Sequence, residues 1–85
     1  MELENWRKEI DAIDASMAEL FGKRMAIAEK IGAYKKENRL PIHDPEREKE
    51  VLKKNLARLN RPEYADLYAD FMRYLFVLTK RLEEK

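Results

Sequence analysis

A row of mostly apolar residues, spaced alternately by three and four over residues 10–34, limits most strongly how this chain can fold. This spacing predicts one face of a long amphipathic helix, and no proline interrupts residues 4–37. At 1.5 Å per residue the helix would be about 50 Å long, whereas a compact domain of this size is roughly 30 Å across. The row, called the seam below, is Ile10, Ile13, Met17, Leu20, Arg24, Ile27, Ile31 and Tyr34.

The length of this helix predicts a dimer. The rest of the chain is too short to cover the whole seam, which would leave an apolar stripe facing water. We therefore expect an intertwined homodimer in which two long helices pair. Gly22 and Gly32 lie inside the helix, where each costs about 1 kcal/mol relative to alanine, and we expect them at close contacts between helices.

Two shorter helices are expected after the long one. Asp44 followed by Pro45 is typical of a helix cap and a first helical position, and it predicts a helix over 45–59. A third helix over 63–84 carries apolar residues at intervals of three and four. The sequence thus predicts a single all-α domain, residues 1–85, with one long N-terminal helix and two shorter ones.

Composition excludes several classes of protein. The 18 basic and 17 acidic residues are intermixed and give a net charge of +1, which is unlike the basic face of a nucleic-acid-binding protein. With no cysteine and one histidine, His43, a thiolate or histidine metal cluster is excluded. Residues 1–10 contain no apolar segment of the kind that signal peptides have, and no apolar run is long enough to cross a membrane. We expect a cytoplasmic protein that binds neither nucleic acid nor membranes.

Two cations stand out on the long helix. Arg24 interrupts the apolar seam, and Lys35 follows eleven residues later. Eleven residues at 100° each return within about 20° of the same face, roughly 16 Å further along the axis. The two side chains could therefore converge on a small anion. In the alternative interpretation, Arg24 is buried with a carboxylate partner and Lys35 is an ordinary surface lysine.

Two other groups of polar residues have structural as well as chemical interpretations. Asp44, Arg47 and Glu48 lie at the start of the second helix, where acidic residues favour the helix terminus without any further function. Thr79 and Glu83 lie four apart beside the apolar side of the third helix. No glycine-rich phosphate loop, nucleophile elbow or Ser-His-Asp set is present. Any catalysis should need neither a nucleophile nor a metal or other cofactor.

Taken together, these positions resemble the all-helical (type II) chorismate mutases over residues 3–83. The resemblance is carried by Arg7 in WRKEIDAID, Arg24 in GKRMAIAEKIGAYK, Lys35, and the run DPERE at 44–48. It implies an isomerase of phenylalanine and tyrosine biosynthesis that converts the dianion chorismate to prephenate by a Claisen rearrangement. Such a pericyclic step needs a compact substrate conformer and positive charge beside the ether oxygen.

The resemblance also implies roles for individual residues. Arg24 should bind a substrate carboxylate through a bidentate fork, and Lys35 should contact a carboxylate and the ether oxygen. Glu48, with the backbone around Asp44, should bind the ring hydroxyl. Arg47 should line the site and hold the acidic side chains in place.

The third helix departs from the commonest bacterial pattern of the family. Thr79 and Glu83 stand where that pattern has Ser and Gln, and the fungal branch is similar in having Glu. An ionised carboxylate cannot donate a hydrogen bond to an ether oxygen that gains negative charge. We therefore expect Glu83 to act as a neutral acid, so that activity falls as the pH rises.

Arg7 gives a second argument for a dimer. It lies 17 residues from Arg24, about 25 Å away along a continuous helix, so a ligand about 10 Å long cannot easily contact both in one chain. An antiparallel partner could supply its Arg7 to the site that holds this chain's Arg24. The resemblance implies the same sharing.

Two alternatives stay open. The first is an enzyme similar to isochorismate-pyruvate lyase, which also binds a dianionic enolpyruvyl substrate with Arg and Lys. The set Asp44, Arg47 and Glu48 favours the mutase, because it suits a ring hydroxyl at the position found in chorismate. The second is a helical dimerisation module without catalytic activity, which would explain the seam but not the charge at Arg24.

Overall fold

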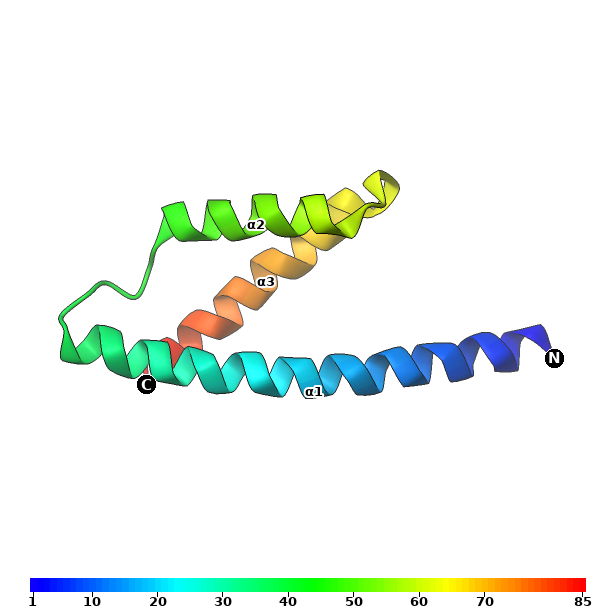
Figure 1. Ribbon diagram of the computed structural model, residues 1–85, viewed down its shortest axis with the longest axis horizontal. Coiled ribbons are helices and arrows are strands. Elements are labelled where there is room, and N and C mark those ends of the chain that lie inside the picture. The colour runs from blue at the N-terminus through cyan, green and yellow to red at the C-terminus, as the bar shows by residue number, and fades with distance from the viewer.

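The computed structural model describes residues 1–85 and contains three α-helices and no strands, so the predicted all-α class is confirmed. Helix α1 spans Glu2–Glu37, α2 spans Pro45–Leu59 and α3 spans Ala65–Glu83 (Figure 1). Helix α1 begins two residues before the expected start. The third segment begins with a 3-10 turn, η1, at Pro62–Tyr64, because the Tyr64 N–H donates to the Arg61 carbonyl three residues earlier.

Local chemistry sets where α2 begins and ends. The Asp44 side chain accepts a hydrogen bond from the Arg47 backbone N–H at 3.1 Å, and Pro45 occupies the first helical position. Asn60 ends the helix in the left-handed conformation with φ of 53°, which asparagine tolerates better than most residues. The predicted cap is therefore present, and it fixes the first turn of α2.

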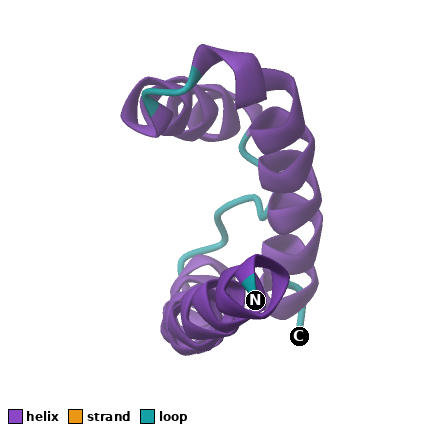
Figure 2. Ribbon diagram, turned by 90° about the vertical axis from the view of Figure 1, so that its right-hand side faces the viewer, coloured by secondary structure: helices purple, strands orange, loops and turns teal.

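Helix α3 holds the other two helices apart. It packs against both α1 and α2, and it crosses between them diagonally (Figure 1). Seen along the length of the molecule, the three helices form an open C, with α1 and α2 as its arms (Figure 2). The molecule measures 56 × 25 × 16 Å, far longer than the roughly 30 Å of a compact domain of this size.

The buried core is small and lies at the C-terminal half of α1. Only seven of 85 residues are buried, and all come from α1 after residue 24 or from α3. A Cβ atom at Gly32 would lie 2.6 Å from the Glu83 Cα and 2.7 Å from the Glu83 carbonyl oxygen. Glycine is therefore required where α1 meets the end of α3. Nothing lies within 4 Å of such an atom at Gly22, so the expected close contact there is not made within one chain.

The N-terminal part of α1 packs against nothing in its own chain. All of residues 1–23 are exposed, and the N-terminal end of α1, blue in the figure, extends beyond the other helices (Figure 1). Six of the large apolar side chains on it are between 47% and 62% exposed; they form the apolar stripe, which consists of Leu3, Trp6, Ile10, Ile13, Met17 and Leu20. None of the helices has the length and apolar character needed to cross a membrane.

Candidate active site

A pocket of about 370 Å³ is lined by residues of all three helices and of the segment that precedes α2. It brings together seven of the eight site residues expected from the sequence, which come from α1, α2 with its cap, and α3: Arg24, Lys35, Asp44, Arg47, Glu48, Thr79 and Glu83. Its remaining wall is Ile31, Ile42, Val51, Phe76 and Lys80. Its volume lies in the range of small-molecule sites.

The Arg24 side chain contacts α3 by a hydrogen bond to an uncharged residue, Thr79. Its Nη1 atom donates to the Thr79 hydroxyl at 2.6 Å, and that hydroxyl donates in turn to the Leu75 carbonyl at 2.9 Å. No carboxylate of the chain lies within 4.0 Å of the Arg24 guanidinium, although most other arginines of the C-terminal half form ion pairs. The interpretation of Arg24 as half of a buried ion pair within the chain is therefore wrong. Its guanidinium has donors left for an anion from outside.

Lys35, on α1, bonds both to α3 and to the segment that precedes α2. Its Nζ atom donates to Glu83 Oε1 at 3.1 Å and to the Ile42 carbonyl at 3.2 Å. The side chains of Lys35 and Glu83 are 19% and 8% exposed. The bond to Lys35 holds the Glu83 carboxyl group in the pocket. The close contact with Gly32 places the Glu83 backbone against α1.

Helix α2 supplies the opposite wall. We expected the Arg47 guanidinium to hold the acidic side chains of the site in place. The acid that it contacts is a different one, Glu50, one turn along the same helix. The hydrogen bond from Arg47, and secondly that from Lys54, lower the pKa of Glu50 below its ordinary value of 4.5. Asp44 instead accepts the backbone N–H of Arg47. Arg47 is thus anchored at the outer edge of the pocket by a surface pair.

Lys80 is a site residue that the sequence reasoning missed. Its Nζ atom lies 3.1 Å from Glu48 Oε2, and both side chains are about one quarter exposed. Helical spacing could have revealed it, because Phe76, Thr79, Lys80 and Glu83 are separated by three or four residues and share one face of α3. The pocket therefore contains four cations and three acids. Of the cations, only Arg24 has no carboxylate partner.

Comparison with known proteins identifies the family. The model of the family "Chorismate mutase type II" matches residues 6–84. The chain belongs to this family. The resemblance seen in the sequence is thereby confirmed.

Two curated relatives of this type II family member are much longer than it is. It is 45% identical to the bifunctional chorismate mutase/prephenate dehydratase of Aquifex aeolicus (strain VF5) over 67 residues, which are 79% of this chain and 18% of that protein. It is 37% identical to the T-protein of Haemophilus influenzae (strain ATCC 51907 / DSM 11121 / KW20 / Rd) over 70 residues, which are 82% of this chain and 18% of that protein. The chain thus spans less than a fifth of either relative. No solved structure matches it significantly.

One expected site residue of this family member lies far from the pocket. Arg7 is exposed and does not line the pocket. Because α1 is continuous from Glu2 to Glu37, the 17 residues between Arg7 and Arg24 correspond to about 25 Å along the axis. A single chain does not bring these two arginines together.

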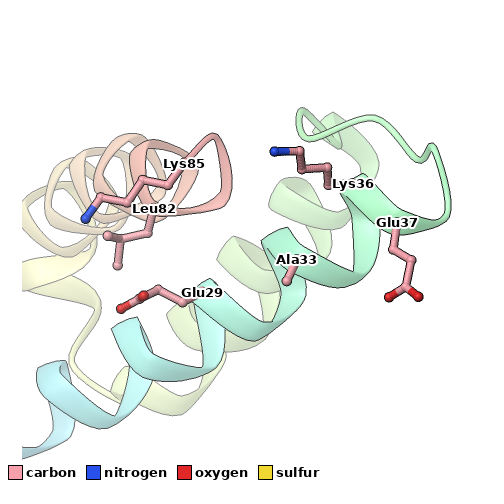
Figure 3. A pocket seen from close by; sticks show the side chains of 6 residues that line it. All are labelled: Glu29, Ala33, Lys36, Glu37, Leu82 and Lys85. Atoms are coloured by element: carbon pink, nitrogen blue, oxygen red, sulfur yellow. The ribbon is translucent and has the colours of Figure 1, made fainter.

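A second hollow on this family member lacks the features of a binding site. It measures about 410 Å³ and is lined by Glu29, Ala33, Lys36, Glu37, Leu82 and Lys85. The charged ends of Lys36 and Glu37 point in different directions rather than toward a common point (Figure 3). Sites for small molecules usually combine a mainly apolar wall with converging polar groups, whereas only two of the six residues that line this hollow, Ala33 and Leu82, are apolar.

Proposed function

We propose that this chain is a chorismate mutase, an isomerase that converts chorismate to prephenate without a cofactor. The observation that carries the proposal is the Arg24 guanidinium. It has no carboxylate partner in its own chain, yet it lines a small pocket together with Lys35. A dianionic ligand would supply that partner. Membership in the type II family makes chorismate the substrate that fits best.

The proposed reaction is an intramolecular rearrangement. The ether C–O bond of the enolpyruvyl group breaks as a new C–C bond forms to the ring, and no proton is gained or lost. Catalysis then consists of holding a compact conformer and stabilising the negative charge that develops on the ether oxygen. The pocket's paired and unpaired cations suit this chemistry, which requires no nucleophile.

The binding roles follow from where the cations and acids lie. Arg24 binds one substrate carboxylate through two parallel hydrogen bonds, keeping its contact with Thr79. Lys35, already bonded to Glu83, contacts a carboxylate and the ether oxygen. On the opposite wall, Glu48 and the backbone around Asp44 bind the ring hydroxyl. Arg47 closes the outer edge of the pocket.

Glu83 has the most demanding role in this proposal. Its carboxyl group lies 3.1 Å from Lys35 Nζ, so both groups would face the same ether oxygen. A carboxylate there would repel the developing charge, whereas a neutral carboxylic acid can donate a hydrogen bond. In the proposed mechanism Glu83 therefore binds a proton in the complex and donates it as a hydrogen bond.

The proposed active unit is an intertwined homodimer. The apolar stripe is exposed over the first 23 residues of one chain, and a paired α1 helix is its simplest cover. In an antiparallel pair, the N-terminal half of one α1 lies beside the C-terminal half of the other. Arg7 of the partner subunit would then reach the pocket containing this chain's Arg24. We also propose that the enzyme acts in the cytoplasm, in phenylalanine and tyrosine biosynthesis.

The test of the activity is direct. Purified protein should remove the absorbance of chorismate and form prephenate, while isochorismate supplied in parallel should release no pyruvate. Turnover of isochorismate but not chorismate would assign the lyase reaction instead. If neither substrate is consumed by a folded protein, the proposal is wrong.

The shared site has its own experiment. Arg7→Ala and Arg24→Ala should each be inactive alone, but mixing them and allowing subunits to exchange should restore activity. In each heterodimer one of the two sites has both arginines, so random exchange of equal amounts restores roughly a quarter of the wild-type sites. Sedimentation shows whether dimers form and exchange. Proven exchange without any recovery would contradict a shared site.

A further inference from the structure

The ion pair between Lys80 and Glu48 is distinct among those of this chain. Eight ion pairs are present; six join residues two to four apart, with every side chain more than half exposed. The other two join different helices, and both line the pocket. One of these is the pair of Lys35 and Glu83, whose function is proposed above. The other, between Lys80 on α3 and Glu48 on α2, has no role in that proposal.

Burial makes this pair more than a surface contact. The side chains of Lys80 and Glu48 are 27% and 28% exposed. Exposed ion pairs contribute little because water screens them and both side chains lose conformational freedom. Partial burial reduces that screening. A side chain whose freedom is already lost to such a pair needs less ordering when a ligand binds.

The geometry gives the pair a specific task. Lys80 contacts Oε2 of Glu48, which leaves the other carboxylate oxygen as an acceptor. An ionised carboxylate only accepts hydrogen bonds, so it suits a ligand's hydroxyl group. Because Glu48 belongs to the first turn of α2 and Lys80 to α3, the pair also fixes the wall of the pocket that receives that hydroxyl.

We propose that Lys80 is a positioning residue: its ammonium group holds the Glu48 carboxylate so that Glu48 accepts a hydrogen bond from a hydroxyl group of the substrate. The inference rests on the proposed function. It assigns to α3 a part in recognising the ring hydroxyl of the substrate, in addition to the ether oxygen that Glu83 is proposed to face. Lys80 acts through Glu48 and does not itself contact the substrate.

The test measures kcat and KM for chorismate in Lys80→Met. The hydroxyl keeps its bond to the ring throughout the rearrangement and carries none of the charge that develops on the ether oxygen, so losing its contact weakens ground-state and transition-state binding alike. We expect KM to rise roughly three- to tenfold, as for a partly screened charged contact, with kcat changed by less than about twofold. Lys80→Gln should behave in the same way, and Lys80→Arg, which keeps the charge, should restore most of the lost binding.

A double-mutant cycle distinguishes positioning from direct contact. In a Glu48→Ala background Lys80 has nothing to position, so Lys80→Met should change KM by less than about twofold. Lys49→Met is the matched control, because it removes the same charge from a pair on α2 in which Lys49 is 78% exposed. The control should leave both kinetic constants unchanged.

Each other result overturns the inference. An equal rise in KM in both backgrounds would make Lys80 a direct substrate contact, and an unchanged KM in Lys80→Met would leave it no role. A loss confined to kcat would place it at the reacting bonds. Failure of the proposed function itself is seen separately, since it would leave the wild-type protein inactive before any variant is made.

Discussion

Replacing Gly32 with alanine tests how strongly catalysis depends on the contact between α1 and the end of α3. The added Cβ atom would lie 2.6 Å from the Glu83 Cα, 2.7 Å from its carbonyl oxygen and 3.0 Å from its carbonyl carbon. All three neighbours are backbone atoms, so no side-chain rotation relieves the overlap. Helix α3 must move away from α1, or α1 must bend.

The size of that movement follows from the distances. To lengthen the shortest contact from 2.6 Å to the 3.4 Å of ordinary van der Waals contact, the Glu83 backbone must shift by about 0.8 Å. The same shift separates the Glu83 carboxyl group from Lys35, now at 3.1 Å. Displacements near 1 Å in a catalytic group can cost a factor of about 100. We expect kcat/KM of Gly32→Ala to fall roughly 30- to 100-fold.

The effect on stability should be small enough for the variant to fold. Alanine in a helix gains about 1 kcal/mol over glycine, while overpacking costs about 1–3 kcal/mol. These terms partly offset each other, so Gly32→Ala should lose between zero and about 2 kcal/mol of its free energy of unfolding. Gly22→Ala is the matched control, because nothing lies within 4 Å of its added atom in the chain. It should gain about 1 kcal/mol of stability and keep its activity.

The assay is the initial rate of chorismate loss for both variants, with thermal unfolding followed by circular dichroism. The reasoning would be refuted by a Gly32→Ala enzyme with wild-type kcat/KM. It would also be refuted by an equal loss in Gly22→Ala, since that would locate the effect in the helix rather than in the contact with Glu83.

Three further predictions concern the charged groups. Arg24→Leu should lose activity at least about 100-fold while its melting temperature stays the same or rises, because a partly buried charge is removed; retained activity would contradict the role of Arg24 in binding the substrate. In Glu83→Gln the pH–rate profile should be flat from about pH 5 to 8, whereas wild-type activity should fall with rising pH as the acid ionises; coincident profiles would contradict the neutral-acid role. Arg47, and secondly Lys54, lower the pKa of Glu50 from 4.5, so the folded state binds the Glu50 proton more weakly than the unfolded state does. The stabilisation that the ionised Glu50 gives is therefore present above its unfolded pKa, and it disappears as the pH falls through its lowered pKa in the folded state. The melting temperatures of wild type and Glu50→Gln should therefore differ at neutral pH and converge in acid, and parallel curves down to about pH 2.5 would argue against the pairing.

The helices could be predicted from the sequence because their signals are local. Intervals of three and four residues identify each helix, and the Asp44 cap depends on a bond to Arg47, three residues away. The 3-10 turn at Pro62–Tyr64 was missed, because its single turn has no periodicity to detect. Local patterns thus give the elements but not the details of their ends.

Contacts between helices were only partly predictable. The sequence indicated that Arg24 and Lys35 share a face, but their partners Thr79 and Glu83 lie 55 and 48 residues further along the chain. Which α3 side chains meet them depends on how α3 crosses α1, and no local pattern fixes that crossing. The same limit hid Lys80, whose place on the Thr79 face could be read from the sequence but whose partner could not.

Helix α1 packs against α3 only in its C-terminal part. Its two parts must therefore be stabilised differently, although they form one continuous helix. Amides near Met25, Ala28 and Gly32 should be protected by packing against α3, so their hydrogen exchange should report the folding of the single chain. Residues 1–23 have no such packing, and most helical stability in proteins comes from packing rather than from helix propensity. Their exchange rates would then depend on protein concentration, because only a partner could protect them. Amide exchange along this helix therefore separates folding from association within one molecule, residue by residue.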